Sequence, residues 1–209
     1  MLALQEIDRQ YTPIEGIEDL IDWVACSDEL SEGALERAMA QRPSVCLEKT
    51  LRWSRSANQA IAQVSGIYPF ESVESALRYA HNHADIAVVS GANRAAVTEE
   101  WEKNRLMDYV DIVMTQDCGS KSTCLAKLLQ EGYATDHVLM CGDAPGDERA
   151  ARESGVYFYP ILAGREEESW RAFIDVGFGR LLSGQYADYE QEKRQQFYQN
   201  LGVEGKESW

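Results

Sequence analysis

The segment Val138–Asp147 (VLMCGDAPGD) decides the architecture of this chain, because an uninterrupted apolar run ends there in a tight acidic loop. Apolar runs without alternation are typical of strands in a parallel sheet that is covered on both faces. Two other segments are placed in a similar way: Ile86–Arg94 (IAVVSGANR) ends a strand at Ser90, and Gly119–Ser122 (GSKS) opens a helix. Ligands of open α/β sheets bind outside the carboxyl ends of the strands, so we expect all three segments at one rim.

From Tyr68 onward the sequence alternates between helical and strand patterns. Strands are predicted over 85–90, 109–115, 137–141 and 156–161. Helices are predicted over 72–81, 95–105, 120–131, 146–154, 166–182 and 186–200. This alternation predicts right-handed crossovers and an α/β fold with a doubly wound parallel sheet.

The first 66 residues read as helices only. An apolar face at helical spacing begins with Leu4, Ile7 and Tyr11, Ser31 is a candidate N-cap for a helix over 32–40, and another helix is predicted over 45–64. We therefore expect three regions, which are a helical segment (1–66), an α/β core (67–201) and a frayed tail (202–209).

The composition excludes several classes of protein. No apolar stretch approaches the roughly 20 residues of a membrane span. The first eight residues lack the basic start of a signal peptide, so a cytoplasmic location is expected. A formal net charge of −15 argues against binding to nucleic acid or to an anionic membrane surface. A phosphate site in so acidic a chain needs locally concentrated positive groups.

The five cysteines are best interpreted as reduced thiols. Their number is odd and no Cys-x-x-Cys occurs, which is typical of a protein without a disulfide framework. No cluster of cysteine and histidine has the spacing of zinc ligands, so a zinc site is not predicted.

Ser90 is a candidate phosphate-binding residue. It is followed by Gly91 and Ala92, and a hydroxyl beside free backbone N–H groups at a tight strand-to-helix turn forms a cradle for an anion. The competing interpretation is a serine that only caps the following helix.

Lys121 stands in the first turn of a predicted helix, where the helix dipole disfavours a cation. An anion nearby would explain this placement, whereas a solvated lysine is the alternative. The surrounding residues also resemble the end of a P-loop, but Ser120 stands where the second glycine belongs, and no glycine lies five residues before Ser120.

Asp143 and Asp147 follow a buried strand and flank Ala144-Pro145-Gly146. Paired carboxylates of this kind suit Mg²⁺, which takes one or two protein carboxylates and keeps several waters. Alternatively, one of the two aspartates only stabilises the turn and caps the next helix.

In order and spacing, the three segments resemble motifs II, III and IV of the haloacid-dehalogenase-like (HAD) phosphohydrolases, over residues 68–165. The resemblance implies that Ser90 hydrogen-bonds the transferred phosphoryl group and that Lys121 neutralises its charge. It implies that Asp143 binds Mg²⁺, with Asp147 completing the metal site. The helical segment in front resembles the C1-type cap of that family, whose residues select the substrate.

The chain departs from the family at the first motif, an Asp-x-Asp whose first aspartate attacks phosphorus. No Asp-x-Asp occurs in the 209 residues. Asp85, Asp108 and Asp111 are poor substitutes, because they precede or begin strands and so lie away from the site. Without a positioned carboxylate nucleophile, the remaining groups hold a phosphate or a metal but do not complete the two-step reaction.

The resemblance also implies a gap in the sheet. The first strand of the family lies between the strand that ends at Ser90 and the one that precedes Asp143. Its absence would leave two inner edges with unpaired backbone groups. The chain would then close the gap, borrow a strand through a homodimer, or be less stable.

The first predicted helix has apolar residues at helical spacing from the first position, Met1, Leu4 and Ile7, and no capping residue precedes them. Together with the missing motif, this suggests a truncated product or a mis-assigned start of a longer phosphohydrolase. Reading the DNA upstream of Met1 tests this hypothesis.

The sequence thus indicates a HAD-like hydrolase that by descent is a Mg²⁺-dependent phosphatase of a small phosphorylated metabolite. As written, the chain is expected to be inactive or weak. Two alternatives remain open: a non-catalytic binding or partner module with a vestigial phosphate pocket, and a P-loop-like nucleotide binder.

Overall fold

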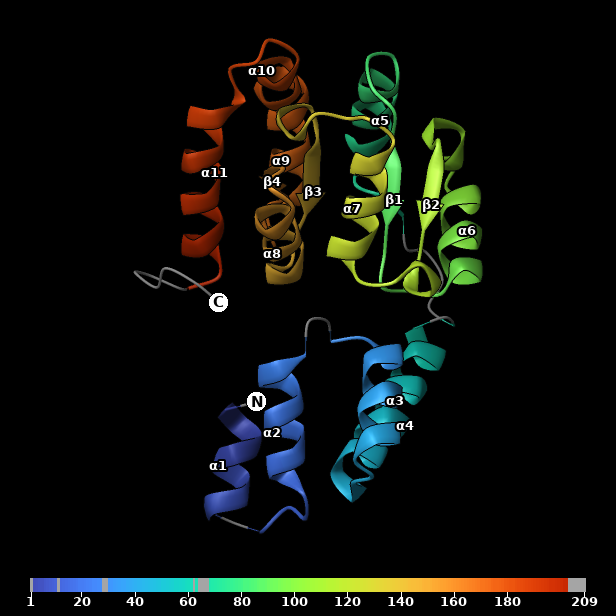
Figure 1. The fold of residues 1–209 in the computed structure, drawn as a ribbon, viewed down its shortest axis with the longest axis vertical. Helices are drawn as coiled ribbons and strands as arrows, with labels where there is room; N and C mark the ends of the chain where they lie inside the picture. Colours follow the sequence, from blue (N-terminus) through green and yellow to red (C-terminus); the bar gives the residue numbers. More distant parts are fainter. Residues whose placement is uncertain (1, 11, 28–29, 62, 64–67, 203–209) are drawn as a thin grey trace. The chain divides into compact units, whose positions relative to one another are not determined.

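The computed structural model describes residues 2–10, 12–27, 30–61, 63 and 68–202. It divides the chain into two compact units, Met1–Ile67 and Tyr68–Trp209 (Figure 1). Predictions that concern Met1, Tyr11, the end of the helix over 45–64 and the tail 203–209 lie outside the described residues.

The first unit is helical, as its sequence predicts. Its helices are α1 (Leu2–Gln10), α2 (Ile17–Cys26), α3 (Glu32–Gln41) and α4 (Val45–Ile61). The predicted N-cap of α3 is confirmed, because the Ser31 hydroxyl accepts a hydrogen bond from the Ala34 N–H at 3.2 Å. Apolar residues from α2, α3 and α4 form the small core of this unit; they are Leu20, Leu35, Cys46, Leu47 and Leu51.

The second unit contains four short parallel strands in two separate ladders. One ladder joins β1 (Ala87–Val89) to β2 (Ile112–Met114), and the other joins β3 (Leu139–Gly142) to β4 (Tyr157–Pro160). Among the described residues no ladder joins β1 to β3. The prediction of an α/β chain with parallel strands is confirmed, but the strands form two ladders instead of one continuous sheet.

Helices alternate with these strands along the second unit. They are α5 (Val73–His81), α6 (Arg94–Lys103), α7 (Lys121–Gln130), α8 (Pro145–Ser154), α9 (Glu166–Ala172), α10 (Phe178–Leu182) and α11 (Tyr186–Asn200). In Figure 1, β3 and β1 are drawn between β4 and β2, and α11 runs beside β4. Short 3₁₀ turns occupy Met107–Tyr109, Gln116–Cys118 and Thr135–His137.

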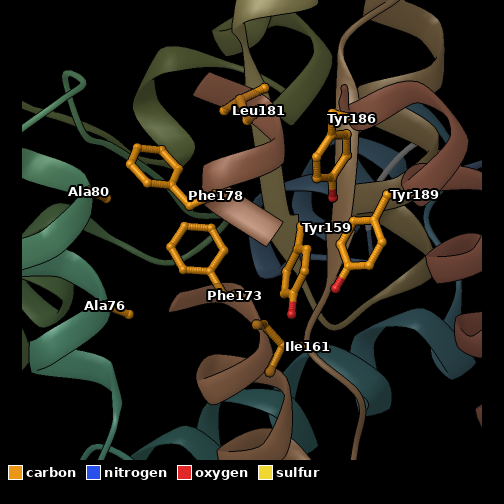
Figure 2. Packing of buried hydrophobic residues seen from close by; sticks show 9 residues of the cluster. All are labelled: Ala76, Ala80, Tyr159, Ile161, Phe173, Phe178, Leu181, Tyr186 and Tyr189. Atoms are coloured by element: carbon orange, nitrogen blue, oxygen red, sulfur yellow. The ribbon is translucent and has the colours of Figure 1, made fainter. Parts of the chain in front are cut away.

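An aromatic cluster forms the main core of the second unit (Figure 2). Tyr159 of β4 and Phe173 meet edge to face with ring centroids 5.4 Å apart, and Phe173 stacks on Phe178 at 5.3 Å. Burial of such rings supplies a large part of the hydrophobic stabilisation of a domain. A second cluster is built around Leu125, Met140, Phe158 and Phe197, so β3 and β4 each contribute one residue to it.

Two predicted elements differ from the structure. The strand predicted over 109–115 begins only at Ile112. The Ile86 N–H donates to the Asp111 side-chain carboxylate at 2.7 Å, so it does not pair with the backbone of the residues before Ile112. The helix predicted over 166–182 is interrupted by a π-helical turn, Phe173–Gly177. At Gly177 an added Cβ would lie 2.9 Å from the Tyr159 ring, so this turn allows the helix to approach β4 closely.

No helix within the described residues combines the length and the apolar character that crossing a bilayer requires.

Candidate functional site

The centre of the candidate site is an ion pair between Lys121 and Asp147. Lys121 is the first residue of α7, and its ammonium group donates to Oδ1 of Asp147 in the first turn of α8. The side chain of Lys121 is 25% exposed and that of Asp147 only 5%. The unfavourable position of a cation at a helix start is therefore offset by a buried carboxylate of the same chain.

The second oxygen of Asp147 is also occupied. Oδ2 accepts a hydrogen bond from the Ala144 N–H at 3.1 Å, which closes the acidic loop onto the start of α8. Asp147 thus stabilises the helix start and holds Lys121 at the same time, but it is the third residue of α8, and the N-cap that was expected to be an aspartate is Ala144. Both oxygens are engaged, so a metal ion bound at Asp147 would share them with Lys121 and the Ala144 N–H.

Gly142 at the end of β3 allows this close packing. A Cβ atom built on Gly142 would lie 2.4 Å from the Cβ, Cγ and Oδ2 atoms of Asp147. Real Cβ atoms do not approach other atoms so closely, so any side chain at Gly142 displaces Asp147. Sequence reasoning missed Gly142, for which the only signal was its position directly before Asp143.

Ser90 closes a turn at the carboxyl end of β1. Its N–H donates to the Met114 C=O at 2.9 Å in the ladder, and its hydroxyl accepts from the Ala92 N–H at 3.2 Å. The cap of α6 is Asn93, whose Oδ1 accepts from the Ala96 N–H at 2.9 Å. Ser90 is therefore not the cap of the following helix, and its hydroxyl stays within the turn that contains Gly91 and Ala92.

The loops that carry these residues meet at one rim of the second unit. The Gln116 N–H donates to the Ala92 C=O at 3.2 Å, which joins the loop after β2 to the loop after β1. The pair of Lys121 and Asp147 joins the loop after β2 to the loop after β3. The rim thus collects the segments that contain Ser90, Lys121 and the acidic loop.

A second cation, Arg94, lies at this rim and was not singled out in the sequence. Its Nη2 atom is 3.7 Å from Oδ2 of Asp117 and 3.8 Å from Sγ of Cys118. A hydrogen bond from the buried Thr115 hydroxyl lowers the pKa of Asp117, and the Arg94 charge lowers it further. The position of Arg94, three residues after Gly91, was a signal that could have identified it.

Cys141 lies on β3 beside the acidic loop. Burial, and to a smaller extent the negative charge of Asp147, raises the pKa of this thiol to about 12. Cys141 therefore remains protonated at neutral pH, which makes it a poor nucleophile.

Asp143 is the free carboxylate of the site. It is exposed, and no hydrogen bond or ion pair to it is found within the described part of the chain. The described residues contain no group of three or more histidine, cysteine, aspartate or glutamate side chains that would hold a metal ion. One free carboxylate fits Mg²⁺ only if most of the remaining ligands are water or phosphate oxygens.

This geometry is chemically suited to binding an anion that also recruits a cation. Lys121 supplies a fixed positive charge, and the turn at Ser90 supplies a hydroxyl. Asp143, in the loop after β3, supplies a free carboxylate. The arrangement lacks a carboxylate nucleophile in an Asp-x-Asp motif, since none occurs in the sequence.

Comparison with known proteins identifies the family. The model of the haloacid dehalogenase-like hydrolase family matches residues 24–161, which is more than half of the 209 residues. The match spans α4, both ladders and the three rim segments. No curated protein matches the chain. The extent of the family match shows that this chain belongs to the haloacid dehalogenase-like hydrolases.

Proposed function

We propose that the chain binds the phosphate group of a small phosphorylated metabolite at the rim formed by Ser90, Gly91, Ala92 and Lys121. The observation that carries this proposal is the pair of Lys121 and Asp147, which fixes an ammonium group at the start of a helix and at the carboxyl end of the strands. A fixed cation beside a turn with a hydroxyl is suited to a phosphate dianion.

Mg²⁺ would bind together with the phosphate and not before it. Asp143 is free, whereas Lys121 and the Ala144 N–H occupy both oxygens of Asp147. Mg²⁺ commonly uses one or two carboxylates, several waters and the oxygens of a phosphate. A phosphate beside the Lys121 ammonium group would supply oxygens to a Mg²⁺ ion on Asp143, so the anion and the metal ion would favour each other.

The chain would be a weak phosphatase at most. Asp85 precedes β1 and Asp111 precedes β2, so both lie at the amino ends of the strands, opposite the rim. Both are also engaged, Asp85 by the Tyr133 hydroxyl and Asp111 by the Ile86 N–H. Neither is placed to attack a phosphate bound near Lys121, and phosphoryl transfer requires an aligned nucleophile.

The helical unit would serve as the cap that selects the substrate, as its C1-like pattern implies. The alternative function is a binding or partner module that retains the phosphate pocket without catalysis. The absence of Asp-x-Asp from the sequence favours this alternative over an efficient enzyme.

Calorimetric titration of the full chain with inorganic phosphate, with and without Mg²⁺, tests the proposal. We expect phosphate binding that Mg²⁺ strengthens, and about a tenfold weaker affinity in Lys121→Ala, which corresponds to roughly 1.4 kcal/mol. Lys103→Ala is the matched control, because Lys103 is an exposed lysine on α6. Equal phosphate affinity in Lys121→Ala and Lys103→Ala would contradict the proposal.

Turnover of an aryl phosphate separates the two candidate functions. Slow, Mg²⁺-dependent turnover that is lost in Lys121→Ala indicates a residual phosphatase. Phosphate binding without turnover indicates the non-catalytic module. Binding of ATP without binding of inorganic phosphate would instead favour the P-loop-like alternative.

A further inference from the structure

Arg94 extends from one loop of the candidate site to the next. It is the first residue of α6 and stands four positions after Ser90, so it follows the turn at the carboxyl end of β1. Its Nη2 atom lies 3.7 Å from Oδ2 of Asp117 and 3.8 Å from Sγ of Cys118, both in the loop after β2. The guanidinium group therefore bridges the loop that contains Ser90 and the loop that leads to Lys121.

The turn that this guanidinium group contacts is fixed from several sides. The buried Thr115 hydroxyl donates to Oδ1 of Asp117, and the Lys127 ammonium group donates to the Cys118 C=O at 2.8 Å. The Gln116 N–H donates at 3.2 Å to a backbone carbonyl of the loop after β1. A cation that is held beside a fixed turn loses less conformational freedom when it binds a ligand.

The pair of Arg94 and Asp117 is much looser than the pair of Lys121 and Asp147. The side chains of Arg94 and Asp117 are 50% and 59% exposed, whereas those of Lys121 and Asp147 are 25% and 5% exposed. The distance of 3.7 Å also exceeds the usual N–H···O distance of about 2.7–3.2 Å. An exposed ion pair of this kind contributes little to stability, so Asp117 alone does not account for a cation at this rim.

Most of the hydrogen-bonding capacity of Arg94 is unused. A guanidinium group carries five N–H donors in a planar fork that matches a carboxylate or a phosphate. Within the described residues, the only hydrogen bond and ion pair of Arg94 are those to Cys118 and Asp117, and both involve Nη2. The Nε and Nη1 atoms thus have donors to offer at the rim, and no described protein group accepts from them.

From these observations we infer that Arg94 is a specificity-determining residue that binds a second anionic group of the substrate. The inference rests on the proposed function, in which the phosphate group lies at Ser90 and Lys121. The second group, a carboxylate or another phosphate, lies on the Arg94 guanidinium group. The substrate class is therefore a small metabolite with two anionic groups, one of which is a phosphate monoester.

The charge of the chain is consistent with this assignment. A net charge of −15 repels anions, and it repels a metabolite with two anionic groups more strongly than one with a single group. Such a ligand needs a second cation beside Lys121, and Arg94 supplies it. By contrast, Arg194 is already compensated, because it forms ion pairs with both Glu148 and Glu190.

Calorimetric titration of the full chain with matched phosphate esters tests the inference. One set of probes consists of the phosphate esters of ω-hydroxycarboxylic acids with two, three and four carbons, and each is compared with its primary amide. The other set consists of bisphosphates of the corresponding diols, each compared with the monophosphate. The two members of a pair differ in one anionic group, and the three lengths sample different spacings between the groups.

We expect at least one acid or bisphosphate to bind the natural chain at least fivefold more tightly than its reference. Preference for an acid identifies the second group as a carboxylate, and preference for a bisphosphate identifies it as a phosphate. Arg94→Ala should remove this preference, so it should weaken the charged probe at least fivefold more than inorganic phosphate. Arg94→Lys keeps the charge without the planar fork and should retain only part of the preference, which provides a second variant if Arg94→Ala fails to fold.

Arg78→Ala is the matched control. Arg78 lies in the last turn of α5, which precedes β1, and its side chain is 59% exposed. It forms a similarly loose pair with Glu74 at 3.9 Å. Because Arg78 lies toward the amino end of β1 and away from the rim, Arg78→Ala should keep the full preference for the charged probe.

The possible outcomes separate the inference from the function on which it rests. If inorganic phosphate does not bind, or binds the natural chain and Lys121→Ala equally well, both the proposed function and the inference are wrong. If inorganic phosphate binds through Lys121 but no charged probe is preferred, or the preference survives in Arg94→Ala, only the inference is wrong. Equal loss of the preference in Arg78→Ala and Arg94→Ala would indicate a general effect of charge and would also overturn the inference.

Discussion

The ammonium group of Lys121 and the carboxylate of Asp147 form an ion pair that joins the start of α7 to the first turn of α8. The two residues are 26 positions apart in the sequence, and the carboxylate is almost fully buried. This pair links the loops after β2 and β3, so it has both a structural role and, in the proposed function, a role in holding the phosphate.

A double-mutant cycle should detect this coupling. Lys121→Met leaves a buried carboxylate without its cation and Asp147→Asn leaves a partly buried cation without its anion, so each should cost about 1–3 kcal/mol of unfolding free energy. The double variant should cost less than the sum. Urea unfolding measures all three free energies, and strictly additive values would show that the pair contributes no coupling.

Gly142→Ala should disturb the same site through packing. The new methyl group would lie 2.4 Å from atoms of Asp147, so we expect a loss of about 1–3 kcal/mol and weaker phosphate binding. Gly146→Ala is the matched control, because a Cβ at Gly146 meets nothing within 4 Å. Thermal unfolding compares the two variants, and equal stability of both would contradict the close approach.

Glu190→Ala should weaken the attachment of α11 to β4. It removes the acceptor of the Phe158 N–H and one partner of Arg194, and a buried donor left unsatisfied costs about 1–3 kcal/mol. Glu192→Ala on the same helix removes an exposed residue whose described hydrogen bond is to Gln196, so its effect should stay within about 0.5 kcal/mol. Chemical denaturation of both variants is the measurement. Similar losses in both variants would show that the hydrogen bond from the Phe158 N–H to Glu190 contributes nothing specific to stability.

Stability should decline at alkaline pH because of buried tyrosines. Burial raises the pKa of Tyr159 and of Tyr186 far above the usual value of a phenol, which is about 10. Above that pH the unfolded state loses these protons and the folded state keeps them, so the free energy of unfolding falls as pH rises. Urea unfolding across this pH range measures the decline.

Tyr159→Phe supplies the control for the alkaline effect. The variant loses the hydrogen bond to the Ser169 C=O at 2.6 Å, so it should be less stable at neutral pH. It should also show a shallower decline with rising pH, because one of the two phenols is absent. An identical slope in the variant and the natural chain would assign the pH dependence to other groups.

Local patterns in the sequence predicted the elements and the rim segments. Apolar runs and turn residues act over a few positions, so they located α3 with its Ser31 cap and the four strands. The same short range explains the errors. The Asp111 carboxylate accepts a hydrogen bond from the Ile86 N–H, and the Tyr159 ring packs against Gly177. Both are contacts between segments that lie far apart in the sequence.

The sequence by itself determined the family, the parallel α/β pattern and the set of rim residues, because these depend on residue type and spacing. The tertiary structure decided which anion neutralises Lys121, why residue 142 is glycine and how the described strands divide into two ladders. Such features depend on how close packing brings together residues that lie tens of positions apart. No short-range pattern records those contacts.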